Sequence, residues 1–177
     1  MTYSQTSRIL AIEARRSRLG YALFEGPKRL LDWGASSVPA DLTGSAAAEA
    51  ARKRITSILR RCHPVAIVVK RPRSVKTGRG ATPGPIMSTI AREAAALPIP
   101  VCFLGRTEIQ DAFRIFRGNT KEEIAEVLVS IFPELLARLP PRQKKWQPER
   151  RVMVVFGAVA VGFAHWQRNG TKIPPPE

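Results

Sequence analysis

Two short apolar runs near the start of the chain, residues 9–14 and 19–24, are joined by a turn that is rich in arginine. Runs of this length and composition are typical of β-strands. A third run, at 29–38, follows a Glu-Gly-Pro-Lys turn signal at 25–28. Because connections this short place consecutive strands side by side, the sequence predicts an antiparallel meander of three strands.

The centre of the chain predicts a helix followed by a buried strand. Between 45 and 63 the apolar side chains recur at helical spacing, and the basic side chains fall largely outside that stripe. Residues 64–69 form an unbroken apolar run, the pattern of a strand that is covered on both faces. A helix connects this strand to the preceding ones, so we expect it to pair in parallel.

Three more helices and one strand are expected in the second half. The pattern favours a helix at 85–97, with Ile86, Ile90 and Leu97 facing inward, and a fifth strand at 100–104. A long helix is expected at 120–139, opened by a capping box between Thr120 and Glu123. A final apolar helix is expected at 149–167.

Length and composition predict one domain with a polyanionic partner. The chain has 177 residues, with 29 Lys and Arg against 14 Asp and Glu, a net charge of +15 and a pI near 11.2. We expect one domain at 1–167 with a flexible basic loop at 70–84 and a basic linker at 139–148, followed by a disordered tail at 168–177. The positive charge is spread over several segments, which favours nucleic acid over a membrane surface.

Several features favour a soluble cytoplasmic protein. No apolar run approaches the roughly 20 residues that a membrane span needs. Cys62 and Cys102 lack the spacing of a disulfide framework or a metal site, so a reduced chain is expected.

Short motifs resemble a known family of nucleases. Residues 11–22 read Ala-Ile-Glu-Ala-Arg-Arg-Ser-Arg-Leu-Gly-Tyr-Ala, and residues 106–113 read Arg-Thr-Glu-Ile-Gln-Asp-Ala-Phe. In this order of elements the motifs resemble those of RuvC-type Holliday junction resolvases, and the resemblance extends over 8–166. It implies an α/β, ribonuclease H-like fold: a mixed five-stranded sheet, with three antiparallel strands and then two parallel ones, flanked by helices. It also makes a homodimer plausible by analogy.

The resemblance fails at the catalytic positions. Nucleases of this family hold two Mg²⁺ or Mn²⁺ ions with converging carboxylates. The matching positions here are Glu13, Lys70, Val154 and Gly157, of which only Glu13 can ligate a divalent ion. We therefore expect no metal site and no cofactor, and we expect Glu13 to pair with Lys70 across neighbouring strands. Mg²⁺ or Mn²⁺ would be required only if nuclease activity has been retained.

Three other acids are candidate substitutes for the missing carboxylates, and the two histidines have structural roles as their expected function. Glu108, Asp111 and Glu149 could supply relocated catalytic carboxylates, although each also suits a position near the start of a helix. His63 suits a helix C-terminus, and His165 is expected to be a residue at a helix end rather than a base.

Two basic clusters are the candidate nucleic-acid-binding residues. The first borders the active-site strand of the family, and the second surrounds a tryptophan that could stack on a base. The members of the first are Arg15, Arg16, Arg18, Arg71, Arg73, Lys76 and Arg79, and those of the second are Lys144, Lys145 and Trp146. Phosphate contacts of this kind predict binding that is independent of base sequence and sensitive to salt.

The sequence thus favours a nucleic-acid-binding, RuvC-like domain without two-metal nuclease activity. The partner is expected to be branched or duplex DNA, with RNA as an alternative. Two other functions stay open at this point: a metal-dependent endonuclease with relocated acids, and a protein-interaction subunit of a DNA-processing complex.

Overall fold

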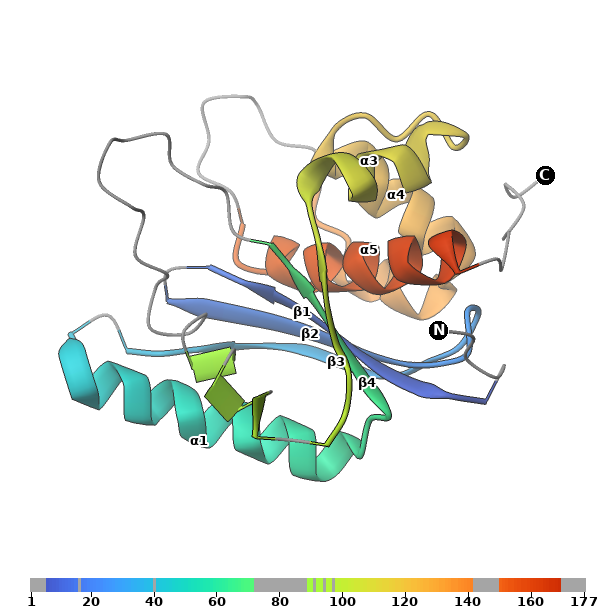
Figure 1. Ribbon diagram of the computed structural model, residues 1–177. Helices are drawn as coiled ribbons and strands as arrows, with labels where there is room; N and C mark the ends of the chain where they lie inside the picture. Colours follow the sequence, from blue (N-terminus) through green and yellow to red (C-terminus); the bar gives the residue numbers. More distant parts are fainter. Residues whose placement is uncertain are drawn as a thin grey trace, which may run out of the picture.

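A mixed five-stranded sheet forms the centre of the computed structural model, in the order β3-β2-β1-β4-β5 (Figure 1). The structure describes residues 6–15, 17–39, 41–71, 89–90, 92–93, 95–96, 98–141 and 150–169. The elements are β1 (Arg8–Ala14), β2 (Arg18–Glu25), β3 (Leu30–Ser37), α1 (Gly44–Cys62), β4 (Ala66–Lys70), β5 (Val101–Leu104), α3 (Arg106–Arg114), α4 (Lys121–Ile131), the 3₁₀ helix η1 (Pro133–Arg138) and α5 (Met153–Arg168).

The pairing of the strands confirms the predicted fold class. β1, β2 and β3 are antiparallel neighbours, whereas β4 pairs with β1 in parallel and β5 with β4 in parallel. The change of direction follows from the connections, because short turns join the first three strands and α1 crosses over between β3 and β4. β4 is buried except at its last residue, as expected for a strand covered on both faces.

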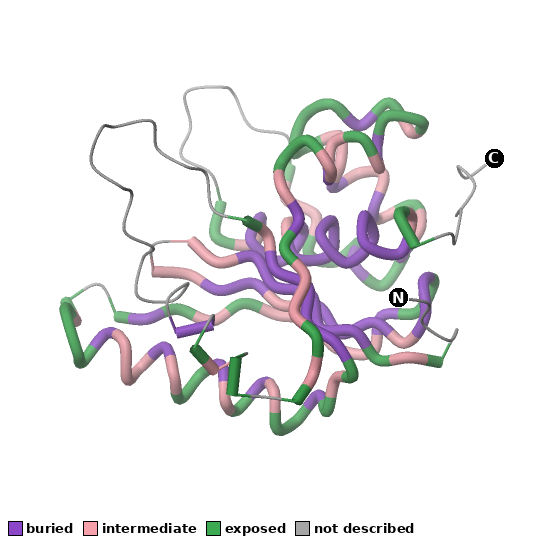
Figure 2. Tube along the Cα trace, in the orientation of Figure 1, coloured by how far each residue is buried: buried purple, intermediate pink, exposed green. Residues whose placement is uncertain are grey.

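Helices cover both faces of the sheet (Figure 1). Successive side chains of a strand point to opposite faces. Leu10 and Ile12 of β1 pack in a cluster with α1, whereas Ile9 and Ala11 pack in a second cluster with α5. The alternation places Glu13 on the face that α5 covers, and Figure 2 shows α5 buried along most of its length.

Glycines allow α5 to lie very close to the sheet. A Cβ atom at Gly20 would be 2.0 Å from the carbonyl oxygen of Val154, and one at Gly162 would be 2.1 Å from the Phe24 ring. Real side chains cannot occupy those positions without a shift of the helix or the ring. The glycines therefore set how closely α5 approaches β2.

The helix predicted at 120–139 is wrong in its second half. The capping box is confirmed, since the Glu123 amide donates to Thr120 Oγ1 at 3.2 Å and Glu123 Oε2 accepts from the Thr120 amide at 3.0 Å. α4 nevertheless ends at Ile131, because Pro133 has no N–H to donate and its ring clashes with the preceding turn. A 3₁₀ helix follows, in which Leu136 is 63% exposed.

Other boundaries also differ from the sequence prediction. α5 begins at Met153 rather than at 149 and runs to Arg168, one residue into the predicted tail, and β4 includes Lys70, the first residue of the predicted loop. Most of the helix predicted at 85–97 lies outside the described residues, but Ile90 is helical and buried as expected. Among the helices that the structure describes, none has both the length and the apolar character that a membrane crossing requires.

Candidate nucleic-acid interface

Glu13 lies at the centre of a small cluster of charges. Its side chain is 5% exposed, and its Oε1 atom accepts a hydrogen bond from Lys70 Nζ at 2.9 Å. The same oxygen accepts from Arg15 Nε at 3.2 Å and from Arg15 Nη2 at 3.1 Å. The predicted pairing of Glu13 with Lys70 is confirmed, whereas the contact with Arg15 was not expected from the sequence.

Strand register explains why these three residues meet. In the parallel pairing of β1 with β4, Ile12 lies opposite Val69, so Glu13 and Lys70 follow as neighbours at the ends of the two strands. Arg15 comes two residues after Glu13, at the start of the turn that the Arg15 amide closes by donating to the Arg18 carbonyl at 2.8 Å. Arg15 is one of the residues that the sequence predicts to bind nucleic acid, and its proximity in sequence to Glu13 is the one signal that could have indicated their contact.

Gly157 of α5 lies directly against the Glu13 carboxylate. A Cβ atom at this position would be 1.2 Å from Glu13 Oε2, so any side chain here would occupy the space of the carboxylate. Within the described residues, Oε2 is buried and has no hydrogen-bond partner. Val154, one turn earlier, is buried against β2 through its backbone.

These residues do not fit a two-metal centre. Hard divalent cations need several carboxylate oxygens, and here one carboxylate contacts an ammonium and a guanidinium instead. In the part of the chain that the structure describes, no three His, Cys, Asp or Glu side chains come together as metal ligands. Glu13, Lys70 and Arg15 therefore form a charge cluster, and Gly157 lies against its carboxylate.

The substitute acids lie elsewhere and have other partners. Glu108 Oε2 accepts from the Gly105 amide at 2.6 Å at the start of α3, and Glu108 also pairs with Arg168. Asp111 pairs with Arg114 at 2.7 Å on the exposed side of the same helix. Glu149 lies outside the described residues. The two described acids therefore act as helix-start and surface residues, and neither is brought to Glu13.

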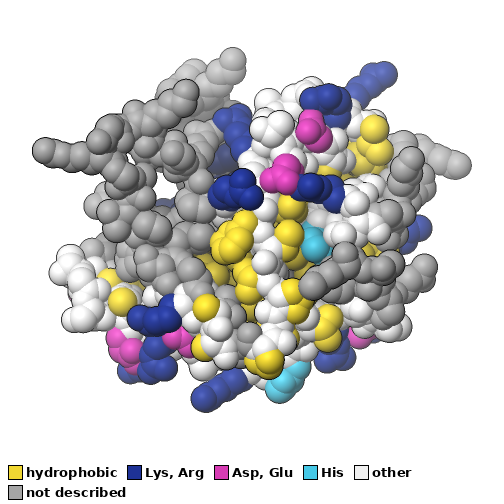
Figure 3. All heavy atoms as spheres, in the orientation of Figure 1, with side chains coloured by type: hydrophobic (Ala, Val, Ile, Leu, Met, Phe, Trp, Pro, Cys, Tyr) yellow, Lys and Arg dark blue, Asp and Glu magenta, His cyan; other side chains and the backbone are white. Residues whose placement is uncertain are grey.

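A groove between β5, α3 and the end of α5 is a feature that the sequence did not reveal. Its volume is about 500 Å³, and its lining includes Phe103, Glu108, His165 and Arg168. Figure 3 shows hydrophobic side chains gathered near the middle of this face of the molecule. His165 lies in the last turn of α5, as expected, and it is buried there. Burial lowers its pKa to about 4 because the imidazolium is poorly solvated.

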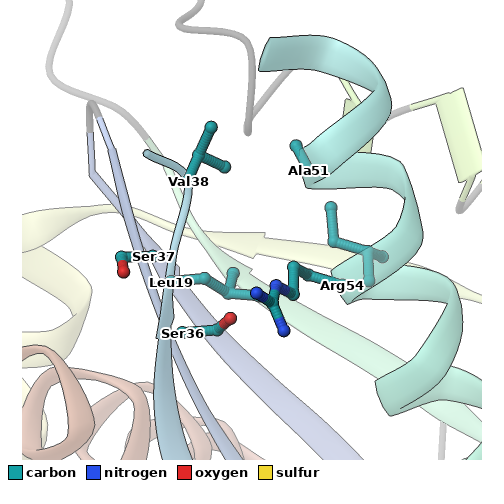
Figure 4. Close-up of a pocket in the computed structure, with 7 residues that line it drawn as sticks. Leu19, Ser36, Ser37, Val38, Ala51 and Arg54 are labelled. Carbon is teal, nitrogen blue, oxygen red and sulfur yellow. The ribbon is translucent and has the colours of Figure 1, made fainter. Parts of the chain in front are cut away.

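A second cavity, between β3 and α1, is lined by Leu19, Ser36, Ser37, Val38, Ala51, Arg54 and Ile55 (Figure 4). Its volume is about 10 Å³, at the limit of what a single water molecule needs. It is therefore a packing gap rather than a ligand site.

Basic side chains gather at one end of the sheet. The β1–β2 turn, the end of β4 and the start of α5 all lie there, at the left of Figure 1. The described basic residues of these segments are Arg15, Arg18, Lys70, Arg71, Arg150 and Arg151. In the described parts of the same segments, Glu13 is the sole acid.

The remaining candidate residues cannot be placed. Arg16, Arg73, Lys76 and Arg79 of the first basic cluster, and Lys144, Lys145 and Trp146 of the second, lie outside the described residues. Of the first cluster, the structure brings Arg15 and Arg18 to the same sheet end as Arg71. His63 caps α1 in a left-handed conformation (φ 44°), and its amide donates to the Leu59 carbonyl at 3.0 Å, as expected for a residue at a helix end.

No family model and no curated protein matches the sequence. Among solved structures, T. thermophilus RuvC in complex with a Holliday junction substrate aligns with a TM-score of 0.69 and 18% identity, covering 93% of this chain and 96% of that one. Another Thermus thermophilus RuvC structure gives 0.67 and 18%, covering 91% and 95%.

A yeast mitochondrial Holliday junction resolvase gives a TM-score of 0.54 at 15% identity, covering 93% of this chain and 82% of that one. Similarity at such low identity establishes the fold, and it agrees with the strand order, the crossover and the position of α5 described above. The chain therefore has the ribonuclease H-like fold of the RuvC-type resolvases.

Proposed function

We propose that this chain is a nucleic-acid-binding domain of RuvC-like fold that has lost two-metal nuclease activity. The observation that carries the proposal is the contact between Lys70 Nζ and Glu13 Oε1 at 2.9 Å. On the resemblance to the resolvases, Lys70 corresponds to a position where the family holds metal ions, and its ammonium would repel a divalent ion that approaches the Glu13 carboxylate.

Gly157 supports the loss of activity independently of charge. An aspartate at 157 would need the space that the Glu13 carboxylate fills. Glu13 and Gly157 are therefore sterically matched, and a carboxylate at 157 would require the Glu13 side chain or α5 to move.

Binding is supported by the charge at the same end of the sheet. Arg15, Arg18, Arg71, Arg150 and Arg151 border the Glu13 cluster, and the whole chain carries a net charge of +15. The similar T. thermophilus RuvC structure contains a Holliday junction substrate. We take DNA, branched or duplex, as the partner, with structured RNA as the alternative to be tested beside it.

A cleavage assay tests the loss of activity. Wild type and Glu13→Ala are incubated with branched DNA and with structured RNA in Mg²⁺ and in Mn²⁺. We expect no cutting by either protein. Metal-dependent cutting by the wild type that disappears in Glu13→Ala would overturn the proposal and restore the nuclease alternative.

Salt dependence tests the binding. Affinity for a four-way junction should fall steeply between 50 and 200 mM salt, as expected when several phosphates are neutralised by Lys and Arg. Affinity that does not change with salt would exclude a phosphate-based interface.

A protein-interaction subunit is the second candidate function. Phe103 of the edge strand β5 is 36% exposed, so part of this edge is apolar. The absorbance ratio at 260 and 280 nm of freshly purified protein separates the two functions. Nucleic acid that co-purifies and is removed by nuclease favours the binding domain.

A further inference from the structure

We infer that the outer face of α1 is a second nucleic-acid-binding surface, separate from the candidate interface at the end of β1 and β4. Its contact residues are Lys53, Arg54, Ser57 and Arg60, and its ligand is the phosphate backbone of a duplex segment. The inference rests on the proposed function and extends it, because one chain would then hold nucleic acid at two places.

The side chains of α1 divide into a buried face and an exposed one. The helix covers the face of the sheet opposite α5 (Figure 1), and its buried residues are Ala47, Ala51, Ile55, Ile58 and Cys62. Lys53, Ser57 and Arg60 are exposed, and they follow one another at intervals of four and three residues. Residues at these intervals lie on the same side of a helix, so the three side chains form a row on the outer face.

Acids do not neutralise the cations of this row. Glu49 is the sole acid of α1, and it accepts two hydrogen bonds of 2.8 Å from Arg52. Within the described residues, Lys53, Arg54 and Arg60 have neither a side-chain hydrogen bond nor an ion pair. These three cations therefore remain available to an anionic partner.

Arg61 ends the same face but has partners in the sheet. Its Nη2 atom pairs with Asp32 at 2.9 Å and donates to the Tyr21 hydroxyl at 2.7 Å, and its guanidinium lies 5.4 Å from the centre of the Tyr21 ring. These contacts attach the end of α1 to β2 and β3. Arg61 is therefore a positioning residue that fixes the helix on which the row is presented.

The length of the row matches several phosphates. Lys53 and Arg60 are seven residues apart, which corresponds to about 10 Å along the helix axis. Each strand of a duplex carries one phosphate per ~3.4 Å of its axis, so the row spans about three phosphates of the nearer strand. Ser57 lies between the cations, and its hydroxyl can donate to a phosphate oxygen.

Nucleic acid fits this face better than a lipid surface does. A helix that binds a membrane inserts its apolar side, whereas the apolar side of α1 packs against the sheet. In the fully described stretch from 53 to 61, the exposed residues are Lys53, Arg54, Ser57, Arg60 and Arg61, and none of them is apolar. A charged and polar face of this kind suits contacts with phosphate and sugar.

Binding of a labelled four-way junction, measured by fluorescence anisotropy at several salt concentrations, tests the inference. Lys53→Gln combined with Arg60→Gln should weaken binding about tenfold at low salt and lower the salt slope by about two, since two phosphate contacts are lost. The matched control is Arg117→Gln combined with Arg138→Gln. It removes the same charge from exposed positions in the helical layer on the other face of the sheet, and it should weaken binding less than about twofold.

A charge-conserving pair separates binding from folding. Lys53→Arg combined with Arg60→Lys keeps both cations on the row, so its affinity should stay within about twofold of the wild type. An affinity as low as that of the glutamine pair would show that the loss is not a loss of charge, and it would overturn the inference.

The remaining outcomes distinguish the two proposals. A wild type that does not bind the junction at low salt overturns the proposed function and the inference together. Salt-sensitive binding that the glutamine pair weakens no more than the control pair does overturns the inference alone. Loss of binding to phosphatidylserine vesicles in that same pair would then assign the face to lipid. Should the pair fail to fold, the single variants Lys53→Gln and Arg60→Gln decide, and wild-type affinity in both overturns the inference.

Discussion

The two ends of α5 bury ionisable groups by opposite means. Near the start of the helix, the Glu13 carboxylate lies against Gly157 between the cations of Lys70 and Arg15. Near its end, His165 is buried beside the groove at β5, and desolvation lowers its pKa to about 4. At the first end the buried group is charged and paired, whereas at the second the buried group is neutral.

This difference separates the candidate interface from the structural part of the molecule. A buried carboxylate is tolerated only with partners, since an unpaired charge costs several kcal/mol. A buried imidazole avoids the same cost by staying neutral. The charged end therefore binds its own counter-cations, while the neutral His165 packs at the end of α5 beside β5.

The largest expected effect is at Gly157. Gly157→Ala should lower the free energy of unfolding by about 3 kcal/mol or more, because its Cβ overlaps Glu13 Oε2. Elsewhere in a helix the same change stabilises by roughly 1 kcal/mol. Denaturant unfolding measures the effect, and the Glu13→Ala background supplies the control. There the penalty should vanish, and an equal cost in both backgrounds would refute the steric match.

Lys70→Ala should destabilise the fold by about 2 kcal/mol, less than the usual cost of breaking a buried pair because Arg15 remains and Lys70 is partly exposed. Thermal unfolding measures the change. Lys53→Ala on the exposed side of α1 is the matched control and should stay within about 0.5 kcal/mol. A melting temperature of Lys70→Ala equal to that of the wild type would count against the pair.

The opposite end of α5 should show a pH dependence. Between the unfolded pKa of 6.5 and the folded pKa of about 4, the unfolded His165 binds a proton that the folded one does not. The contribution of His165 to the free energy of unfolding is therefore complete above pH 6.5 and is lost as the pH falls to 4. We expect a loss of about 2 kcal/mol, less than the full pKa shift implies because His165 borders an open groove. Unfolding curves of wild type and His165→Gln, compared over this range, measure it.

The charged groups that line the same groove are Glu108 and Arg168. They form an ion pair with each other at the rim, so Arg168→Gln in the His165→Gln background separates their contribution. A pH dependence that is the same with and without His165 would assign the effect to other groups.

The smallest effects are expected at the rim of the groove. Glu108→Ala should cost about 1 kcal/mol through the lost hydrogen bond to the Gly105 amide, whereas Arg168→Ala should cost less than about 0.5 kcal/mol because the pair is half exposed. Neither change should affect cleavage assays. Nuclease activity that depended on Glu108 would instead show that catalysis had moved to this end of α5.

Much of the fold could be predicted because its signals are local. The apolar run at 64–69 and the helical stripe at 45–63 each depend on neighbours in sequence, and both elements formed as expected. The helix predicted at 120–139 is wrong beyond Ile131. The apolar stripe continues past Pro133, but the proline ends the α-helix there. The start of α5 was misplaced because Arg150–Val152 carry no clear capping signal.

The sequence by itself determined the class of fold, the surplus of positive charge and the presence of a single acid, Glu13, in the first strand, because each of these is a matter of residue type and order. Only the tertiary structure decided that the Glu13 carboxylate fills the space over Gly157, that Arg15 joins Lys70 on the same oxygen, and that His165 is buried beside a groove. Those contacts depend on strand register and on how closely α5 packs against the sheet, and no single stretch of the chain determines either of them.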